Sequence, residues 1–278
     1  MNKRAIFFIV GIACLVVSFV SVLALMKPVS GSTPLPTDEQ STPVFKPTTP
    51  EPTIDTSTPT PTNTPKPSPQ NSIDPTKPII ALTFDDGPAP STTRILDILE
   101  GYGVRATFFI VGDMACRNSA IVERAYAMGC EIGNHTQTHK VALKGISATE
   151  VRKEITPVDE FMLSLIGERP KYIRPPWGSF DETALDAFER PVILWSVDTR
   201  DWDTRDSQKI VQHIKDNVFD GAILLMHDLY PETANAVGEI VPWLIEQGYQ
   251  LVTIGELFEA RGIELLPGHA YRSAVSEG

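Results

Sequence analysis

Two adjacent aspartates and a pair of closely spaced histidines provide the side chains of a metal site. Asp85 and Asp86 are followed by Gly87, which allows a sharp backbone turn, and His135 and His139 enclose Thr-Gln-Thr. Two imidazoles and one carboxylate are typical ligands of a catalytic divalent ion that keeps positions open for water and substrate. The other carboxylate is then available as a base. The sequence therefore predicts a metal-dependent hydrolase.

Two further basic side chains have the chemistry to assist such a site. Arg174 precedes two prolines that fix the backbone, and it can keep a base carboxylate ionised through a bidentate pair. His227 follows the apolar run 222–226 and is the best candidate for a general acid. An acid histidine needs a carboxylate partner to stay protonated near neutral pH, and either Asp198 or Asp201 can supply it.

Three tryptophans lie near these segments. Trp177 and Trp202 fall in predicted loops, where their rings suit the apolar faces of sugars and can line an open groove. Trp195 falls inside a predicted strand, so we expect it to pack in the core.

Apolar, β-branched runs alternate with segments of helical period along the second part of the chain. Strands are predicted over 78–84, 106–111, 130–133, 172–174, 192–196, 222–226 and 250–254. Helices are predicted over 92–102, 118–128, 147–166, 181–189, 207–219, 233–247 and 254–261. This alternation indicates an α/β fold with parallel strands, and its seven units favour a distorted (β/α)7-type barrel.

The candidate functional residues share one position in this predicted barrel. Each lies at or directly after the C-terminal end of a strand, and they are Asp85, His135, Arg174, Asp198 and His227. That end of the strands is the catalytic face of a β/α barrel. Residues far apart in the sequence should therefore meet at one mouth.

The first part of the chain has a different composition. Residues 5–26 are uncharged and mostly apolar, about 33 Å as a helix, which is long enough to cross a bilayer. Lys3 and Arg4 favour a cytoplasmic N-terminus. We expect a single-pass cell-membrane anchor with the catalytic domain outside, and the alternative is a cleaved signal and a secreted protein.

A linker rich in proline and threonine follows the apolar segment. It carries more than half of the 24 prolines, so it cannot build a packed core. The predicted organisation is an anchor or signal sequence at 1–27, a disordered extracellular linker at 28–77, a catalytic domain at 78–262 and a C-terminal tail at 263–278. We expect the catalytic domain to act as a monomer.

The net charge indicates the class of partner, and the spacing of the cysteines indicates whether they form a disulfide. The formal net charge of −11 argues against nucleic acid and suits a neutral polysaccharide, or one that becomes cationic when treated. Cys116 and Cys130 flank a predicted helix that would hold them about 20 Å apart, beyond the reach of a disulfide. We therefore expect free thiols.

Five segments, in order, resemble the motifs of the polysaccharide deacetylases, the NodB homology domain of carbohydrate esterase family four. They are Thr83-Phe-Asp-Asp-Gly87, His135-Thr-Gln-Thr-His139, Arg174-Pro-Pro-Trp-Gly178, Asp198-Thr-Arg-Asp-Trp202 and Leu225-Met-His227. The resemblance covers about residues 75–262. It implies a distorted barrel and removal of N- or O-acetyl groups from a glycan.

The resemblance also implies roles for individual residues. Asp85 would be the base, and Arg174 would orient it. Asp86, His135 and His139 would hold the divalent ion, with Zn²⁺ expected and Co²⁺, Mn²⁺ or Ni²⁺ as alternatives.

The same resemblance implies how the acetyl group would be bound. The backbone amide of Trp177, where the family often has tyrosine, would donate to the oxyanion. Leu225 would line the acetyl pocket, and Pro175 and Trp202 complete the predicted substrate-binding residues.

Three hypotheses about function remain open. The first is a membrane-anchored amidase that removes N-acetyl groups from peptidoglycan N-acetylglucosamine, which the predicted anchor and linker favour. The second is a chitooligosaccharide deacetylase or an acetylxylan esterase. The third is an inactive glycan-binding module, which would need neither Asp85 nor His227.

Overall fold

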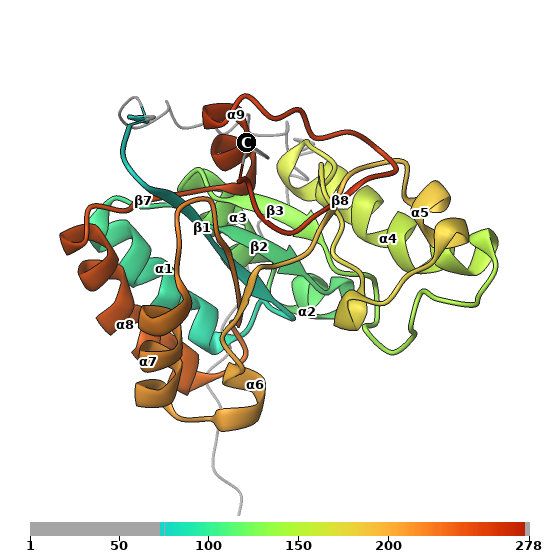
Figure 1. Ribbon diagram of the computed structural model, residues 1–278. Coiled ribbons are helices and arrows are strands. Elements are labelled where there is room, and N and C mark those ends of the chain that lie inside the picture. Colours follow the sequence, from blue (N-terminus) through green and yellow to red (C-terminus); the bar gives the residue numbers. More distant parts are fainter. Residues whose placement is uncertain (1–72, 75, 276–278) are drawn as a thin grey trace, which may run out of the picture. The chain divides into compact units, whose positions relative to one another are not determined.

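The structure of the chain is a computed structural model, and it describes residues 73–74 and 76–275 (Figure 1). In this part of the chain no helix is long and apolar enough to cross a membrane. The predicted anchor at 5–26 and almost all of the predicted linker at 28–77 lie outside the described residues.

Parallel strands form the centre of the fold. They are β1 (Ile79–Asp85), β2 (Thr107–Ile110), β3 (Glu131–Asn134), β4 (Val192–Ile193), β5 (Val197–Asp198), β6 (Ile223–His227), β7 (Gln250–Val252) and β8 (Ala270–Tyr271). β1 is buried along its whole length and pairs with β2 on one edge and with β6 on the other. β7 pairs with the first residues of β1, and the order across the sheet is β3-β2-β1-β6-β5.

A single residue, Ile173, connects the two ends of this sheet. It forms parallel bridges to Asn134 at the end of β3 and to Val192 at the start of β4. The segment 192–198 begins as β4 beside Ile173 and ends as β5 beside β6. The sheet thus returns to β6, which confirms the predicted α/β fold with a distorted barrel.

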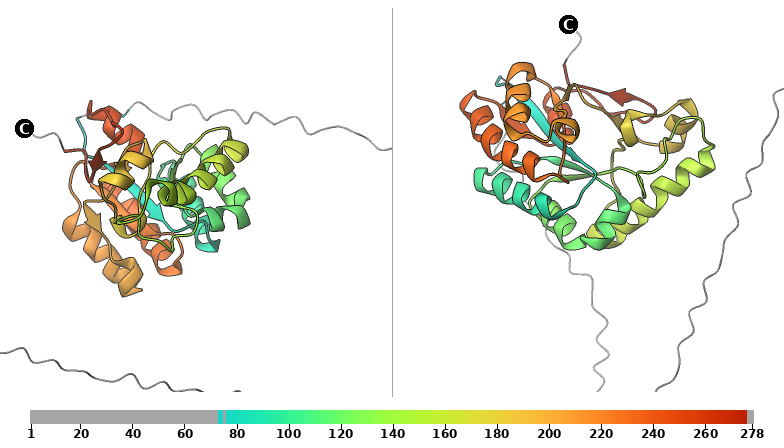
Figure 2. Two further views of the ribbon diagram at one scale, coloured as in Figure 1. Left: turned by 90° about the vertical axis from the view of Figure 1, so that its right-hand side faces the viewer. Right: turned by 90° about the horizontal axis from the view of Figure 1, so that it is seen from below.

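Helices lie outside the strands. They are α1 (Pro90–Tyr102), α2 (Gly112–Arg117), α3 (Ser119–Ala127), α4 (Ala148–Ile166), α5 (Glu182–Phe188), α6 (Asp201–Thr204), α7 (Ser207–Asn217), α8 (Pro231–Glu246) and α9 (Ile254–Ala260), with a 3₁₀ turn at Pro176–Gly178. α8 packs against both α1 and α7, at the left of Figure 1, while α4 packs with α5 at the right (Figures 1 and 2). α4 begins at a capping box formed by Ser147 and Glu150.

The alternation of side chains along β1 decides which of them reach the site. Ile80, Leu82 and Phe84 pack in the core cluster beneath the helices. The residues between them face the other way. Thr83 and Asp85 therefore share a face, and both contact the same arginine inside the barrel.

Several predicted elements differ from the structure. The strand predicted over 172–174 is reduced to the single bridge at Ile173, because the two following prolines cannot donate to a ladder. The strand predicted over 192–196 splits into β4 and β5, with the N–H of Leu194 bonded to Tyr271 instead. The short helices α2 and α6 were not predicted.

The segment that we predicted as a C-terminal tail contributes to the fold. β8 lies within it and pairs with β4, and Ala274 is buried and donates its N–H to the carbonyl of Gly221. The prediction for the cysteines is confirmed, since Cys116 and Cys130 are both free. Burial raises the pKa of Cys130 to about 12, so this thiol stays protonated.

Candidate active site

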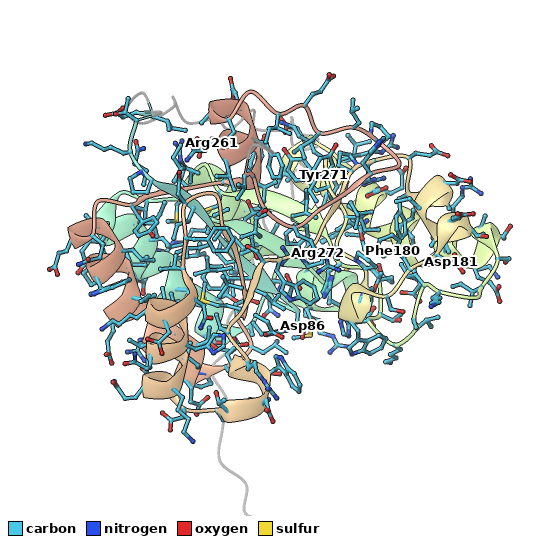
Figure 3. The ribbon with its side chains drawn as sticks, in the orientation of Figure 1. Asp86, Phe180, Asp181, Arg261, Tyr271 and Arg272 are labelled. Carbon is cyan, nitrogen blue, oxygen red and sulfur yellow. The ribbon has the colours of Figure 1, made fainter. Side chains whose placement is uncertain are left out.

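Three predicted metal ligands meet beyond the C-terminal ends of β1 and β3. Oδ1 of Asp86 lies 3.3 Å from Nε2 of His135 and 3.3 Å from Nε2 of His139. One ligand atom from each residue lies within 4.8 Å of the others. Figure 3 labels Asp86 near the end of β1, at the barrel mouth.

The geometry of these residues fits a divalent ion. Oδ1 of Asp86 is shielded from solvent and has no hydrogen-bond partner among the described residues, whereas buried polar atoms are normally paired. Asp86 and His139 have left-handed backbones, with φ of 74° and 54°, a conformation that costs about 1–3 kcal/mol and clusters at functional sites. Two imidazole nitrogens and one carboxylate oxygen are ligands that Zn²⁺ accepts.

A backbone contact orients the first histidine. Nδ1 of His135 lies 2.5 Å from the carbonyl oxygen of Arg174, which can only accept, so Nδ1 carries the proton and Nε2 presents its lone pair. Burial alone would raise the pKa of Asp86, but the neighbouring imidazoles of His135 and His139 lower it to about 2. The carboxylate of Asp86 is therefore ionised, as a ligand must be.

Asp85 lies beside this set and is held by Arg174. Nη1 of Arg174 donates to Oδ1 of Asp85 at 2.7 Å, and Oδ2 lies 3.6 Å from Nε2 of His135. The predicted contact is present, but it is not bidentate. Nη1 also donates to Thr83, while Nε and Nη2 donate to two backbone carbonyls, so Nη1 is the one nitrogen that reaches Asp85.

The ion pair between Arg174 and Asp85 is buried, so it holds the Asp85 carboxylate firmly in one orientation. The side chain of Arg174 is completely buried, and Asp85 is 3% exposed. Burial lowers the pKa of Arg174, and the charge of Asp85 opposes that shift, but a guanidinium stays charged in proteins. The aromatic ring of Phe109 lies 4.1 Å from the guanidinium carbon and adds a cation–π contact. Asp85 thus has one oxygen fixed by Arg174 and the other directed at the metal set, by which we mean the three candidate metal ligands Asp86, His135 and His139.

His227 is paired with Asp201. Nδ1 of His227 lies 2.7 Å from Oδ1 of Asp201, whose Oδ2 accepts from the N–H of His227 at 2.6 Å and from Thr233 at 2.7 Å. Burial alone would lower the pKa of His227, but the hydrogen bond and charge of Asp201 outweigh it and raise the pKa to about 9. His227 is therefore protonated at neutral pH, with Nε2 as the group free to donate a proton.

Asp198 and Asp201 were alternatives for this pairing, and the structure selects Asp201. Asp198 lines the cleft instead, and its Oδ1 accepts from the N–H of Arg200 at 2.9 Å. Asp201 is completely buried at the start of α6, a helix that the sequence did not predict. That turn directs its carboxylate at His227.

An open cleft of about 460 Å³ lies over the metal set. Trp177 and Trp202 are 61% and 47% exposed on its walls, and Leu225 is buried at its floor. The ring of Trp177 meets the ring of His139 edge-on at a centroid distance of 4.9 Å. Large exposed aromatic faces around a polar centre suit the binding of sugar rings.

Three other residues depart from the sequence predictions for this cleft. Trp195 is only partly buried and lines the cleft, because β4 ends before it; it also packs against the core. Pro175 is buried at the start of the 3₁₀ turn and is not part of the lining. Tyr230, which the sequence did not single out, lines the cleft with its ring 6.1 Å from that of His227.

A second cavity of about 500 Å³ opens near the start of β3. It is lined by Glu131, Tyr172 and the ion pair between Arg105 and Glu256, and it contains none of the metal-ligand set. Oε2 of Glu131 accepts from the N–H of Gly255 at 2.9 Å, so this carboxyl group is already engaged by the fold. The chemistry therefore belongs to the smaller cleft.

The fold agrees with comparisons to known proteins. A family profile described as polysaccharide deacetylase matches residues 72–190. A peptidoglycan-N-acetylglucosamine deacetylase of Bacillus cereus is 38% identical over 188 residues, which are 64% of this chain and 87% of that protein. The chain belongs to the polysaccharide deacetylase family.

Members of this family have different named substrates. The peptidoglycan-N-acetylmuramic acid deacetylase PdaC of Bacillus subtilis is 38% identical over 193 residues, which are 69% of this chain. Those residues are 41% of PdaC, so the chain spans about two fifths of that relative. The structure of a family 4 acetyl xylan esterase from Clostridium thermocellum, in complex with a cobalt ion, matches with a TM-score of 0.67 at 33% identity, over 70% of this chain and 98% of that chain.

One buried residue near the site was missed by the sequence reasoning. Asp228 is 1% exposed, and its Oδ2 accepts from Thr92 at 2.6 Å. A Cβ on Gly87 would lie 2.1 Å from that oxygen, so Gly87 is required by this close approach rather than by a left-handed turn. Burial, opposed by the Thr92 hydrogen bond, raises the pKa of Asp228 to about 7. The available signal was a carboxylate directly after His227.

Proposed function

We propose that this polysaccharide deacetylase hydrolyses N-acetyl groups of a cell-wall glycan, with peptidoglycan N-acetylglucosamine as the substrate. The observation that carries the proposal is the pair of proton-transfer groups beside the metal set. Asp85 is fixed by Arg174 at 2.7 Å, and His227 is fixed by Asp201 at 2.7 Å. A module that only binds glycans needs neither pair, so this arrangement favours an enzyme over an inactive module.

The metal centre would be formed by Asp86, His135 and His139. A divalent ion held by them would act as a Lewis acid that polarises the acetyl carbonyl and lowers the pKa of the attacking water. We propose Zn²⁺, and the same ligands suit Co²⁺, Mn²⁺ or Ni²⁺. The cobalt ion in the related acetyl xylan esterase supports a divalent ion of this kind.

Asp85 would accept a proton from the attacking water through its free oxygen, Oδ2. Arg174 holds the other oxygen and so keeps the carboxylate correctly turned. The backbone N–H of Trp177, in the left-handed conformation at φ 55°, would donate to the developing oxyanion. Leu225 would contact the acetyl methyl group at the floor of the cleft.

His227 would complete the reaction by protonating the leaving nitrogen. Its Nε2 carries the proton, since Nδ1 is engaged with Asp201. Water thus supplies the hydroxyl of acetate, Asp85 takes the proton of that water, and His227 gives a proton to the amine. The products are acetate and a glycan with a free amino group.

Replacing Asp201 by asparagine is expected to move the alkaline limb of the pH profile. The pKa of His227 is raised to about 9 from its ordinary 6.5 chiefly because Asp201 outweighs burial, so an acid His227 is active below about pH 9. Without that charge the pKa should fall toward 6.5 or lower, and kcat/KM should decline at a correspondingly lower pH. Asp203→Asn, at an exposed position in the same turn, is the control. An unshifted alkaline limb would show that His227 is not the acid.

A panel of glycans tests the proposed substrate. Acetate release would be measured on cell-wall fragments, chitooligosaccharides and acetylxylan at the same metal concentration. We expect the highest kcat/KM on wall fragments, with mass spectrometry locating the lost acetyl group on N-acetylglucosamine. Preference for chitooligosaccharides or acetylxylan would favour the second hypothesis, and loss from N-acetylmuramic acid would correct the sugar. Binding without acetate release would support the inactive module.

We also propose that residues 5–26 anchor the chain in the cell membrane and that the domain acts outside it. The apolar composition of that segment and the proline-rich linker after it support this placement, because the wall lies away from the bilayer. Protease treatment of intact cells should release the catalytic domain. A mature chain beginning near Ser32 in the medium would instead indicate a cleaved signal and a secreted enzyme.

A further inference from the structure

The loop that carries both histidine ligands is conformationally costly. Thr136 and His139 have left-handed backbones, with φ of 70° and 54°. For a β-branched residue such as Thr136 this is a genuine outlier, and it persists only where neighbouring contacts hold it. The start of α2 supplies some of these contacts, because the N–H groups of Gly112 and Asp113 donate to the carbonyls of Thr136 and Gln137. The others come from one turn of α4.

Glu154 on α4 holds the middle of the loop at three points. Its Oε2 accepts from the N–H of Thr138 at 3.0 Å, and its Oε1 accepts from the hydroxyl of Thr138 at 3.0 Å. Its backbone carbonyl accepts from the N–H of Gln137 at 2.7 Å. The residue directly before His139 is therefore fixed by both its backbone and its side chain.

Asp159, one turn further along α4, holds the start of the loop through Asn134. Nδ2 of Asn134 donates to Oδ1 of Asp159 at 2.8 Å and to the carbonyl of Ile155 at 2.9 Å. Oδ1 of Asn134 in turn accepts from the N–H of Thr136 at 2.8 Å. Asp159 is 6% exposed and is itself held by both terminal nitrogens of Arg190.

A proline inside α4 makes this turn unusual. Pro157 has no N–H, so the carbonyl of Lys153, four residues earlier, lacks its helical donor. The next two carbonyls, of Glu154 and Ile155, are the ones that accept hydrogen bonds from the loop. The helix thus presents backbone acceptors as well as two carboxylates to the metal-binding loop.

We propose that the α4 turn from Glu154 to Asp159 positions His135 and His139, so that Glu154 and Asp159 set the affinity of the metal site without touching metal or substrate. The inference rests on the proposed metal site. Groups that hold metal ligands in place typically change metal affinity by about 10–100-fold when they are removed.

The test measures Zn²⁺ affinity directly on the full-length chain, by competition with a chromophoric chelator. Glu154→Ala should weaken Zn²⁺ binding by about 10–100-fold, while kcat at saturating Zn²⁺ stays near that of the unmodified protein. Glu154→Gln keeps an acceptor for the N–H of Thr138 and should recover most of the affinity. Asp159→Ala should also weaken binding.

Two controls separate positioning from general loosening of the fold. Glu160→Ala changes a neighbouring carboxylate on the same helix, one that pairs with Arg169 on the surface and does not contact the loop, so its Zn²⁺ affinity should not change. The thermal midpoint of the metal-free protein reports folding, and if Asp159→Ala fails to fold, Glu154 decides the matter. Unchanged affinity in Glu154→Ala, or an equal loss in Glu160→Ala, would overturn the inference. Absence of Zn²⁺ binding by the unmodified chain would instead refute the metal site itself.

Discussion

Asp85→Asn is expected to lower kcat by a factor on the order of a hundred or more, because a general base contributes about 10²–10⁴-fold. Asparagine keeps an oxygen that can accept from Arg174, which is 2.7 Å from Oδ1 of Asp85. It replaces the other oxygen by an amide nitrogen, which cannot accept a proton from water. The measurement is kcat for acetate release from wall fragments at saturating Zn²⁺.

Metal content distinguishes a lost base from a lost ligand in that variant. Bound zinc should stay at the level of the unmodified protein, because Asp86 and not Asp85 carries the unpaired, shielded oxygen between the two histidines. Asp97→Asn is a matched control, since Asp97 is an exposed residue of α1 that pairs with Arg124. If Asp85→Asn lost its zinc, Asp85 would be a ligand and the proposed division between the two aspartates would be wrong.

Removal of the metal is expected to abolish activity, and Zn²⁺, Co²⁺ or Mn²⁺ should restore it. The reason is that Asp86, His135 and His139 converge within 4.8 Å, and without an ion nothing else described at the site polarises the acetyl carbonyl as strongly. The measurement is acetate release before and after chelation, and again after each metal is added back. His139→Ala should reproduce the loss, and added metal should not reverse it, because one of the three ligands is gone.

A second histidine variant controls for nonspecific effects of the substitution. His269 is exposed on the surface, and its Nδ1 contacts only the carbonyl of Pro267. His269→Ala should therefore keep both zinc and activity. Full activity in a thoroughly metal-stripped enzyme would refute the proposed mechanism.

Much of the fold could be predicted because its signals are local. Apolar β-branched runs and helical periods lie within single segments, and they located most strands and helices to within a few residues. The predicted barrel placed Asp85, His135 and His227 at strand ends, which is where the structure has them. Elements of a few residues, such as α6 and β8, carry too little periodicity to be recognised.

The contacts inside the site could not be predicted in the same way. Asp198 and Asp201 are the same residue type in one short segment, so the sequence does not distinguish them as partners of His227. The short turn of α6 directs Asp201 at His227. The bidentate pair expected of Arg174 is absent because backbone carbonyls from a segment about twenty residues away occupy its other N–H groups.

By itself the sequence determined the class of protein, the chemical groups available and the face of the barrel on which they lie. These follow from residue type, spacing and the two-residue period of a strand, all of which are properties of short segments. The tertiary structure decided which groups touch: the unpaired oxygen of Asp86 between two histidines, Asp201 rather than Asp198 beside His227, and the hold of α4 on the histidine loop. Such contacts depend on the register and packing of segments far apart in the chain, which no local pattern encodes.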